Sequence, residues 1–84
     1  MKVFALMYHG AYKGETSSSV RLFHNRADAQ ARMKNEYDQS VKDIVRNLGE
    51  DGVYEYSDMS CRTYEEGYYC HNHDEWRICE QEIL

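Results

Sequence analysis

The chain has 84 residues, which is enough for one small domain and too few for two. Its 42% hydrophobic and 13% aromatic content is too high for a disordered chain, so a packed fold is expected. The formal net charge of −5 is unevenly distributed, because residues 1–49 carry eight Lys or Arg against five Asp or Glu, whereas residues 50–84 carry two against ten. The acidic second part would repel phosphates, so direct nucleic-acid binding is not expected.

The expected cellular compartment is inferred from the lack of a membrane span and of a signal peptide in this sequence. No stretch approaches the roughly 18 apolar residues of a membrane span, and the opening MKVFALMYHG becomes polar too soon for a signal peptide. We therefore expect a cytoplasmic protein without membrane contact. Three cysteines are an odd number, and the reducing cytosol would keep them as thiols, so no disulfide framework is expected.

The first half of the chain predicts two strands and a helix. The apolar run 2–9 is typical of a buried strand, the glycine- and serine-containing segment 10–19 indicates an exposed loop, and 19–23 alternates like a strand that pairs back on the first. A loop of this length either contacts a partner or is disordered. Helical spacing then predicts a helix over residues 26–48, with Asn25 as its N-cap and Gly49 just after its end. Its expected apolar face comprises Met33, Tyr37, Val41, Ile44, Val45 and Leu48.

The second half predicts two further strands. Residues 50–57 are expected to be a loop, 58–64 a strand, Glu66 and Gly67 a turn, and 75–84 the last strand, with Trp76 and Ile78 in the core. The chain then has the order β-β-α-β-β. The predicted fold class is α+β, with an antiparallel sheet of about four strands packed on one long helix.

Three segments together resemble a pattern found in small uncharacterised proteins of bacteria and their phages. The matching segments are Val3 to Tyr8, Leu22 to Ala29 and Trp76 to Leu84, and the middle of the chain has no counterpart in the pattern. The resemblance implies an α+β fold and an origin in a phage or another mobile element. It implies no catalytic or binding residue.

The segment YYCHNHDEWRIC, residues 68–79, contains several residue types that bind metals. A zinc site would use Cys70, His71, His73 and Cys79, but the spacing lacks two close pairs of ligands. The favoured interpretation is a hairpin with His73 and Asp74 as its two-residue turn. Cys70, Cys79 and Cys61 would then share one face of the sheet as small apolar residues. We therefore expect no cofactor and no catalytic residue.

Tyrosines and carboxylates accumulate in the second half and suggest a protein-binding patch. Aromatic rings supply area that can be desolvated, and carboxylates attract a basic partner. We expect a non-enzymatic module, encoded by a phage or mobile element, that inhibits a host defence protein by occupying its basic surface. A homodimer with no catalytic role and acidic residues that only maintain solubility remain alternatives. The candidate partner-binding residues are Tyr54, Tyr56, Asp58, Tyr64, Glu65, Glu66, Tyr68, Tyr69, Asp74 and Glu75.

Overall fold

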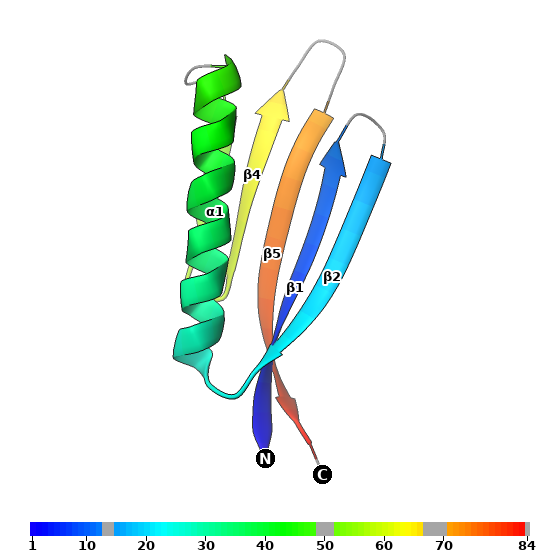
Figure 1. Ribbon diagram of the computed structural model, residues 1–84, viewed down its shortest axis with the longest axis vertical. Helices are drawn as coiled ribbons and strands as arrows, with labels where there is room; N and C mark the ends of the chain where they lie inside the picture. The colour runs from blue at the N-terminus through cyan, green and yellow to red at the C-terminus, as the bar shows by residue number, and fades with distance from the viewer. Residues whose placement is uncertain (13–14, 49–51, 67–70, 84) are drawn as a thin grey trace.

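The computed structural model describes residues 1–12, 15–48, 52–66 and 71–83 (Figure 1). It confirms the α+β class: within the described residues, one helix packs on an antiparallel sheet of five strands. In chain order the elements are β1 (Lys2–Tyr12), β2 (Glu15–Phe23), α1 (Arg26–Leu48), β3 (Gly52–Tyr56), β4 (Ser60–Glu66) and β5 (His71–Glu82).

The sheet has the strand order β2-β1-β5-β4-β3, so the last strand lies in the middle beside the first. β5 pairs with β1 from Lys2↔Glu82 to Ala11↔His73 and with β4 from Ser60↔Arg77 to Glu66↔His71. Met1 and Ile83 therefore lie together at one end of the molecule, where the Ile83 N–H donates to the Met1 carbonyl at 2.7 Å (Figure 1). The two outer strands, β2 and β3, are the edges of the sheet.

The prediction of a loop over residues 10–19 is wrong. β1 continues to Tyr12, β2 begins at Glu15, and Gly10 pairs with Ser17 within the ladder. The serines of β2 occupy exposed positions on an outer strand, where small polar side chains are compatible with an extended backbone. Lys13 and Gly14, which fall within the predicted loop, lie outside the described residues.

The predicted hairpin turn at His73 and Asp74 is also wrong, because both residues lie inside the continuous strand β5. His73 pairs with Ala11 on one side and Tyr64 on the other, and Asp74 pairs with Gly10 and Thr63. The register places Cys61 opposite Trp76, so Cys61 faces the helix.

The prediction that the cysteines share one face of the sheet is wrong for Cys61 and Cys79. Cys79 pairs with Ala5 and lies on the other side of the sheet from Cys61. Both are free thiols. Cys70 and the Gly67 position of the expected preceding turn lie outside the described residues.

Residues 52–56, expected to be part of a loop, form the short edge strand β3. Val53 pairs with Tyr64, Tyr54 with Thr63, and Tyr56 with Cys61. The ring of Tyr54 folds back over Gly52, where a Cβ would lie 2.9 Å from a methyl group of Ile44 in the helix. Glycine therefore lets the strand begin close beneath the helix.

The helix begins as the sequence predicts. The Asn25 side-chain oxygen accepts from the Asp28 N–H at 2.8 Å and thereby caps a backbone donor of the first turn. The Asn25 amide also donates to the Asp28 carboxylate at 3.0 Å, so the two side chains hold each other in place. The predicted end at Leu48 is confirmed, whereas Gly49 lies outside the described residues.

The predicted apolar face of α1 is confirmed at Met33 and Ile44, which are buried, and at Tyr37 and Val41, which are half-buried, but not at Val45; the side chain of Leu48 lies outside the description. Ala29, Met33 and Ile44 are buried, but Val45 is 44% exposed. Ser40 lies on the buried face, and Glu36 and Tyr37 are half-buried. The inward-facing positions have helical spacing, but two of them, Glu36 and Ser40, carry polar side chains. The buried face is therefore centred on these residues and not on Val45.

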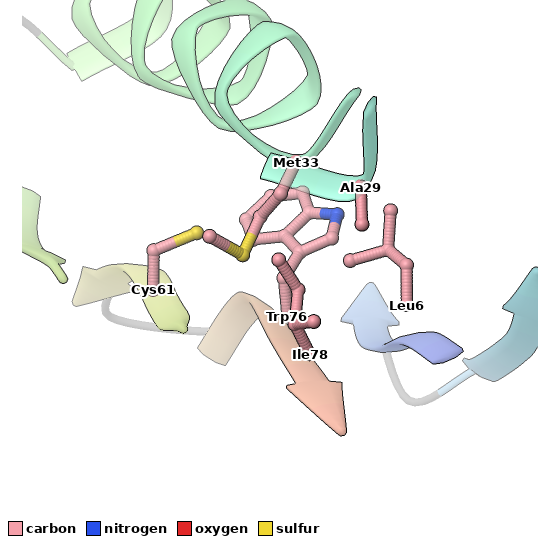
Figure 2. Close-up of a cluster of buried hydrophobic side chains, with 6 residues drawn as sticks. All are labelled: Leu6, Ala29, Met33, Cys61, Trp76 and Ile78. Atoms are coloured by element: carbon pink, nitrogen blue, oxygen red, sulfur yellow. The ribbon is translucent and has the colours of Figure 1, made fainter. Parts of the chain in front are cut away.

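The core lies between α1 and the middle of the sheet (Figure 2). Trp76, predicted as core, is 4% exposed and fills its centre, with the Tyr8 ring 5.4 Å away and the Tyr37 ring 6.4 Å away, measured between ring centroids. The six most buried members are Leu6, Ala29, Met33, Cys61, Trp76 and Ile78. No helix in the described part of the chain is long and apolar enough to cross a membrane.

Candidate binding surface

Glu36 organises a polar cluster on the inner side of the helix. It accepts hydrogen bonds from Arg21 at 2.7 Å, from Arg32 at 2.8 Å and from the Trp76 indole at 3.1 Å. The hydrogen bond from Arg21 is the main reason that the pKa of Glu36 falls to about 2, although partial burial works in the opposite direction. The ionised carboxylate thereby connects β2, α1 and β5.

Asp74 organises a second polar cluster one helical turn away. Its carboxylate accepts from the Tyr8 hydroxyl at 2.6 Å and from the Ser40 hydroxyl at 2.7 Å. Ser40 also shares a hydrogen bond of 2.8 Å with Thr63, whose side chain is fully buried. Burial, and then the hydrogen bond to Asp74, raise the pKa of Tyr8 to about 12. Asp74 is thus an internal acceptor between helix and sheet.

Gly10 makes the second cluster possible. A Cβ at this position would overlap the Tyr8 hydroxyl and lie 2.9 Å from an oxygen of Asp74. Because Gly10 has no side chain, the Tyr8 ring can lie over it and reach Asp74 on the neighbouring strand. Tyr8 therefore lies between Trp76 in the core and Asp74 in the cluster.

The hydrogen-bonded groups of the Glu36 and Asp74 clusters, and the buried thiol of Cys61, are suited to stabilising the fold. Burial is the main cause that raises the pKa of the Cys61 thiol to about 12, so the thiol stays protonated at neutral pH. None of the pKa shifts resolved for the described residues moves a side chain toward neutrality, where general acid–base catalysis is most effective. Nor does any group of three His, Cys, Asp or Glu side chains among those residues come close enough to hold a metal ion.

The side of the sheet opposite the helix, here called the open face, is not covered by any described element. Across its centre runs the paired row Ser18, His9, Glu75, Arg62 and Glu55. Arg62 and Glu55 form a two-pronged ion pair at 2.8 and 3.0 Å. Glu75 is exposed and forms no hydrogen bond or ion pair with a described residue.

Apolar side chains flank this charged row. Val20 and Leu22 on β2 are each 63% exposed and Val53 on β3 is 45% exposed, whereas Val3 and Ala5 on β1 are buried. An uncovered face of an antiparallel sheet is ordinarily polar. Exposed apolar residues on both sides of a charged row are instead typical of a protein-binding surface.

Two adjoining hollows lie over β3, β4 and β5, and they share the open-face residues Arg62 and Glu75. The larger has a volume of about 560 Å³, and its lining includes Arg62, Glu75 and Arg77. The smaller, of about 210 Å³, shares Arg62 and Glu75 and adds Tyr64 and His73. The guanidinium of Arg77 is exposed and has no ion-pair partner among the described side chains. The hollows therefore offer a partner both signs of charge and an aromatic ring.

The predicted partner-binding residues do not form one surface in the structure. Tyr64 and Glu75 lie on the open face, but Tyr54 and Tyr56 lie on the helix side of β3, where Tyr56 contacts the Tyr37 ring at 5.1 Å. Asp74 faces inward, opposite in direction to its neighbour Glu75, because side chains alternate along a strand.

Asp58, a further member of that set, does not line either hollow. Asp58 is exposed in the link between β3 and β4, where its carbonyl accepts from Gln30 at 3.1 Å. Glu65 and Glu66 are the last residues of β4. Tyr68 and Tyr69 lie outside the described residues.

The four residues of the zinc alternative cannot share an ion. His71, His73 and Cys79 lie along the single extended strand β5, and Cys79 is six residues beyond His73. At about 3.3 Å per residue that separation is about 20 Å, whereas zinc ligands lie about 2 Å from the metal. Cys70 lies outside the described residues, and it could not bring the other three together.

Sequence reasoning missed the inward-facing polar residues Glu36 and Ser40. They continue the buried stripe of Ala29, Met33 and Ile44 at helical spacing, so the signal was present once polar residues were allowed on the inner face. It also missed Arg62 and Arg77 as surface residues, because their position on the open face depends on the strand register.

No family model, curated protein sequence or solved structure matches this chain.

Proposed function

We propose that this chain is a non-enzymatic protein-binding module that contacts its partner through the open face of the sheet. The observation that carries the proposal is an uncovered face on which exposed apolar residues flank a charged row and two hollows. Such a surface combines area that can be desolvated with groups that orient a partner. Tyr64 and Glu75, both expected in the binding patch, belong to it.

The partner that we propose is a protein with a basic surface. The net charge of −5 would accelerate encounter with a cationic protein, and Glu75 in the middle of the open face would accept one of its cations. Following the resemblance described above, we propose further that the partner is a host protein and that the chain, encoded by a phage or mobile element, inhibits it. The free thiols Cys61 and Cys79 are consistent with action in the reducing cytoplasm.

A non-enzymatic role is supported by the state of the internal polar groups. Glu36 accepts hydrogen bonds from three residues and Asp74 from two, so both carboxylates are occupied by contacts within the fold. Tyr8 and Cys61, with pKa values raised to about 12, are protonated at neutral pH. The residues with resolved pKa shifts are therefore not prepared for proton transfer or nucleophilic attack.

The test compares two charge reversals on opposite sides of the molecule. Glu75→Arg alters the open face, whereas Asp43→Arg makes the same change at an exposed position of α1. Proteins recovered from a host lysate on immobilised wild type, Glu75→Arg and Asp43→Arg are quantified by mass spectrometry. We expect one protein to be retained by wild type and Asp43→Arg and lost with Glu75→Arg, and its association rate to fall as salt increases.

Equal recovery by wild type and Glu75→Arg would contradict the proposed contact surface. An association rate that does not change with salt would contradict a basic partner. Because both variants alter exposed side chains, their thermal unfolding midpoints should match that of wild type, and this measurement shows that any lost binding is not lost folding.

A further inference from the structure

The outer strand β2 is a long sheet edge without the features that normally prevent pairing. It spans nine residues, and every side chain from Glu15 to Val20 is exposed. Only one of its edges is paired, to β1, so alternate N–H and C=O groups along the other edge point outward. Soluble proteins usually protect such an edge with lysine, proline, a bulge or a covering element.

Within the part of the chain that the structure describes, none of these protections is found on β2. The chain has no proline, β2 has no lysine, and its pairing with β1 is continuous from Phe4↔Phe23 to Tyr12↔Glu15 without a bulge. Its one cation, Arg21, is directed toward the helix and held by Glu36. The opposite edge, β3, is only five residues long and carries the Glu55–Arg62 ion pair. The two edges are therefore not equivalent.

We propose that β2 pairs antiparallel with β2 of a second copy of this chain, forming one continuous sheet across a twofold axis. This interface is separate from the hollows, which lie over β3, β4 and β5 at the other side of the sheet. The inference thus goes beyond the proposed function, since the dimer would present two open faces side by side. The second copy is the natural occupant because a twofold pairing of identical strands satisfies both edges at once.

Side-chain chemistry along β2 selects the register of this pairing. With Ser18 on the twofold axis, Glu15 lies opposite Arg21 of the second copy on the same face of the sheet. The guanidinium of Arg21 is held by Glu36, but its side chain is still 32% exposed and can face the Glu15 carboxylate. Thr16 then lies opposite Val20, and Ser17 opposite Ser19, so the contact is made by β-branched and small side chains. Moving the axis by one residue to Ser17 or Ser19 loses the pairing of Glu15 with Arg21.

The first experiment measures mass in solution by light scattering across a range of concentrations. Wild type is expected at twice the 10.0 kDa of the single chain. Ser18→Lys, which would place two ammonium groups face to face on the axis, is expected at the mass of the single chain with an unchanged circular dichroism spectrum. Val53→Lys, the matched change on the opposite edge strand, should remain a dimer.

A wild type of 10.0 kDa at all concentrations, or a Ser18→Lys variant that stays dimeric, would overturn the proposal. Neither result would bear on the open face, because the Glu75→Arg comparison above does not alter β2. The two proposals can therefore fail independently.

The second experiment tests the register by oxidative crosslinking, with Cys70 and Cys79 replaced by serine. Residues directly opposite in an antiparallel pair have Cα atoms about 4.5 to 5.5 Å apart, which is within the range of a disulfide. Ser18→Cys is therefore expected to form a covalent dimer. Thr16→Cys is the control, because its copies would be four residues out of register, about 14 Å apart. Equal crosslinking by the two variants would overturn the register.

Discussion

Asp74 and Glu75 are adjacent carboxylates with opposite environments, and replacing each by alanine tests the strand register directly. Asp74 faces the helix and accepts from Tyr8 and Ser40 at 2.6 and 2.7 Å, whereas Glu75 is exposed on the open face. Without Asp74, the partly buried Tyr8 hydroxyl loses its acceptor and Ser40 keeps only its bond with Thr63. An unsatisfied buried donor costs about 1–3 kcal/mol, and hydrogen bonds to a charged group contribute about 1.5–3 kcal/mol.

We therefore expect Asp74→Ala to lower the free energy of unfolding by about 2–4 kcal/mol and Glu75→Ala to change it by less than about 0.5 kcal/mol. For a domain of this size, 1 kcal/mol corresponds to a shift in Tm of about 4–8 °C. Thermal unfolding followed by circular dichroism and by Trp76 fluorescence measures both variants. Equal losses, or a larger loss for Glu75→Ala, would refute the assignment of Asp74 to the inner face.

Three further predictions follow from the helix and the core. The pKa of Glu36 is lowered to about 2 from an ordinary 4.5, so the stability that ionised Glu36 contributes is present above about pH 4.5 and is lost as pH falls toward 2. Glu36→Gln should therefore make the free energy of unfolding fall less steeply in acid. An unchanged acid dependence would argue against the Glu36 cluster. Met33→Ala should lower the free energy of unfolding by about 2–5 kcal/mol in urea titrations, since Met33 is fully buried, and a loss below 1 kcal/mol would contradict that burial. In a Cys70→Ser background, a thiol reagent at pH 8 should modify Cys79 well before Cys61, whose pKa is raised to about 12 by burial; the reverse order would place Cys61 outside the core.

Local sequence patterns predicted the helix well because its signals are local. Asn25 and Asp28 form the cap three residues apart, and the apolar spacing over residues 26–48 repeats within a few turns. The predicted buried face was incomplete, because Glu36 and Ser40 are polar and were not included in it. Their burial depends on Arg21, Trp76 and Asp74, which are distant in the sequence.

The mispredicted parts of β1, β2 and β5 share one cause. Residues 10–12, 15–19 and 71–74 contain the glycine, serines, histidines and carboxylates that usually mark turns, yet they belong to long strands. Gly10 is accommodated because the Tyr8 ring covers it, and Asp74 because Ser40 and Tyr8 satisfy it. Each of these contacts comes from a neighbouring element or from a side chain folded over its own strand, so turn propensity alone could not show it.

The residues of the predicted binding patch do not share one surface in the structure. Most of the predicted residues belong to β3, β4 and β5, but the alternation of side chains along each strand distributes them between two faces. A shift of one residue in register reverses every side chain, which is why Tyr64 and Glu75 reach the open face while Tyr56 and Asp74 face the helix.

The sequence by itself determined the fold class, the position and cap of the helix, and the burial of Trp76 and Ile78, because periodicity and capping are encoded over a few residues. Only the tertiary structure decided that β5 lies between β1 and β4 and that Asp74 faces inward. The physical reason is that strand pairing joins residues as distant as Lys2 and Glu82. Their register is fixed by the hydrogen bonds and packing that side chains from several elements form at the same time.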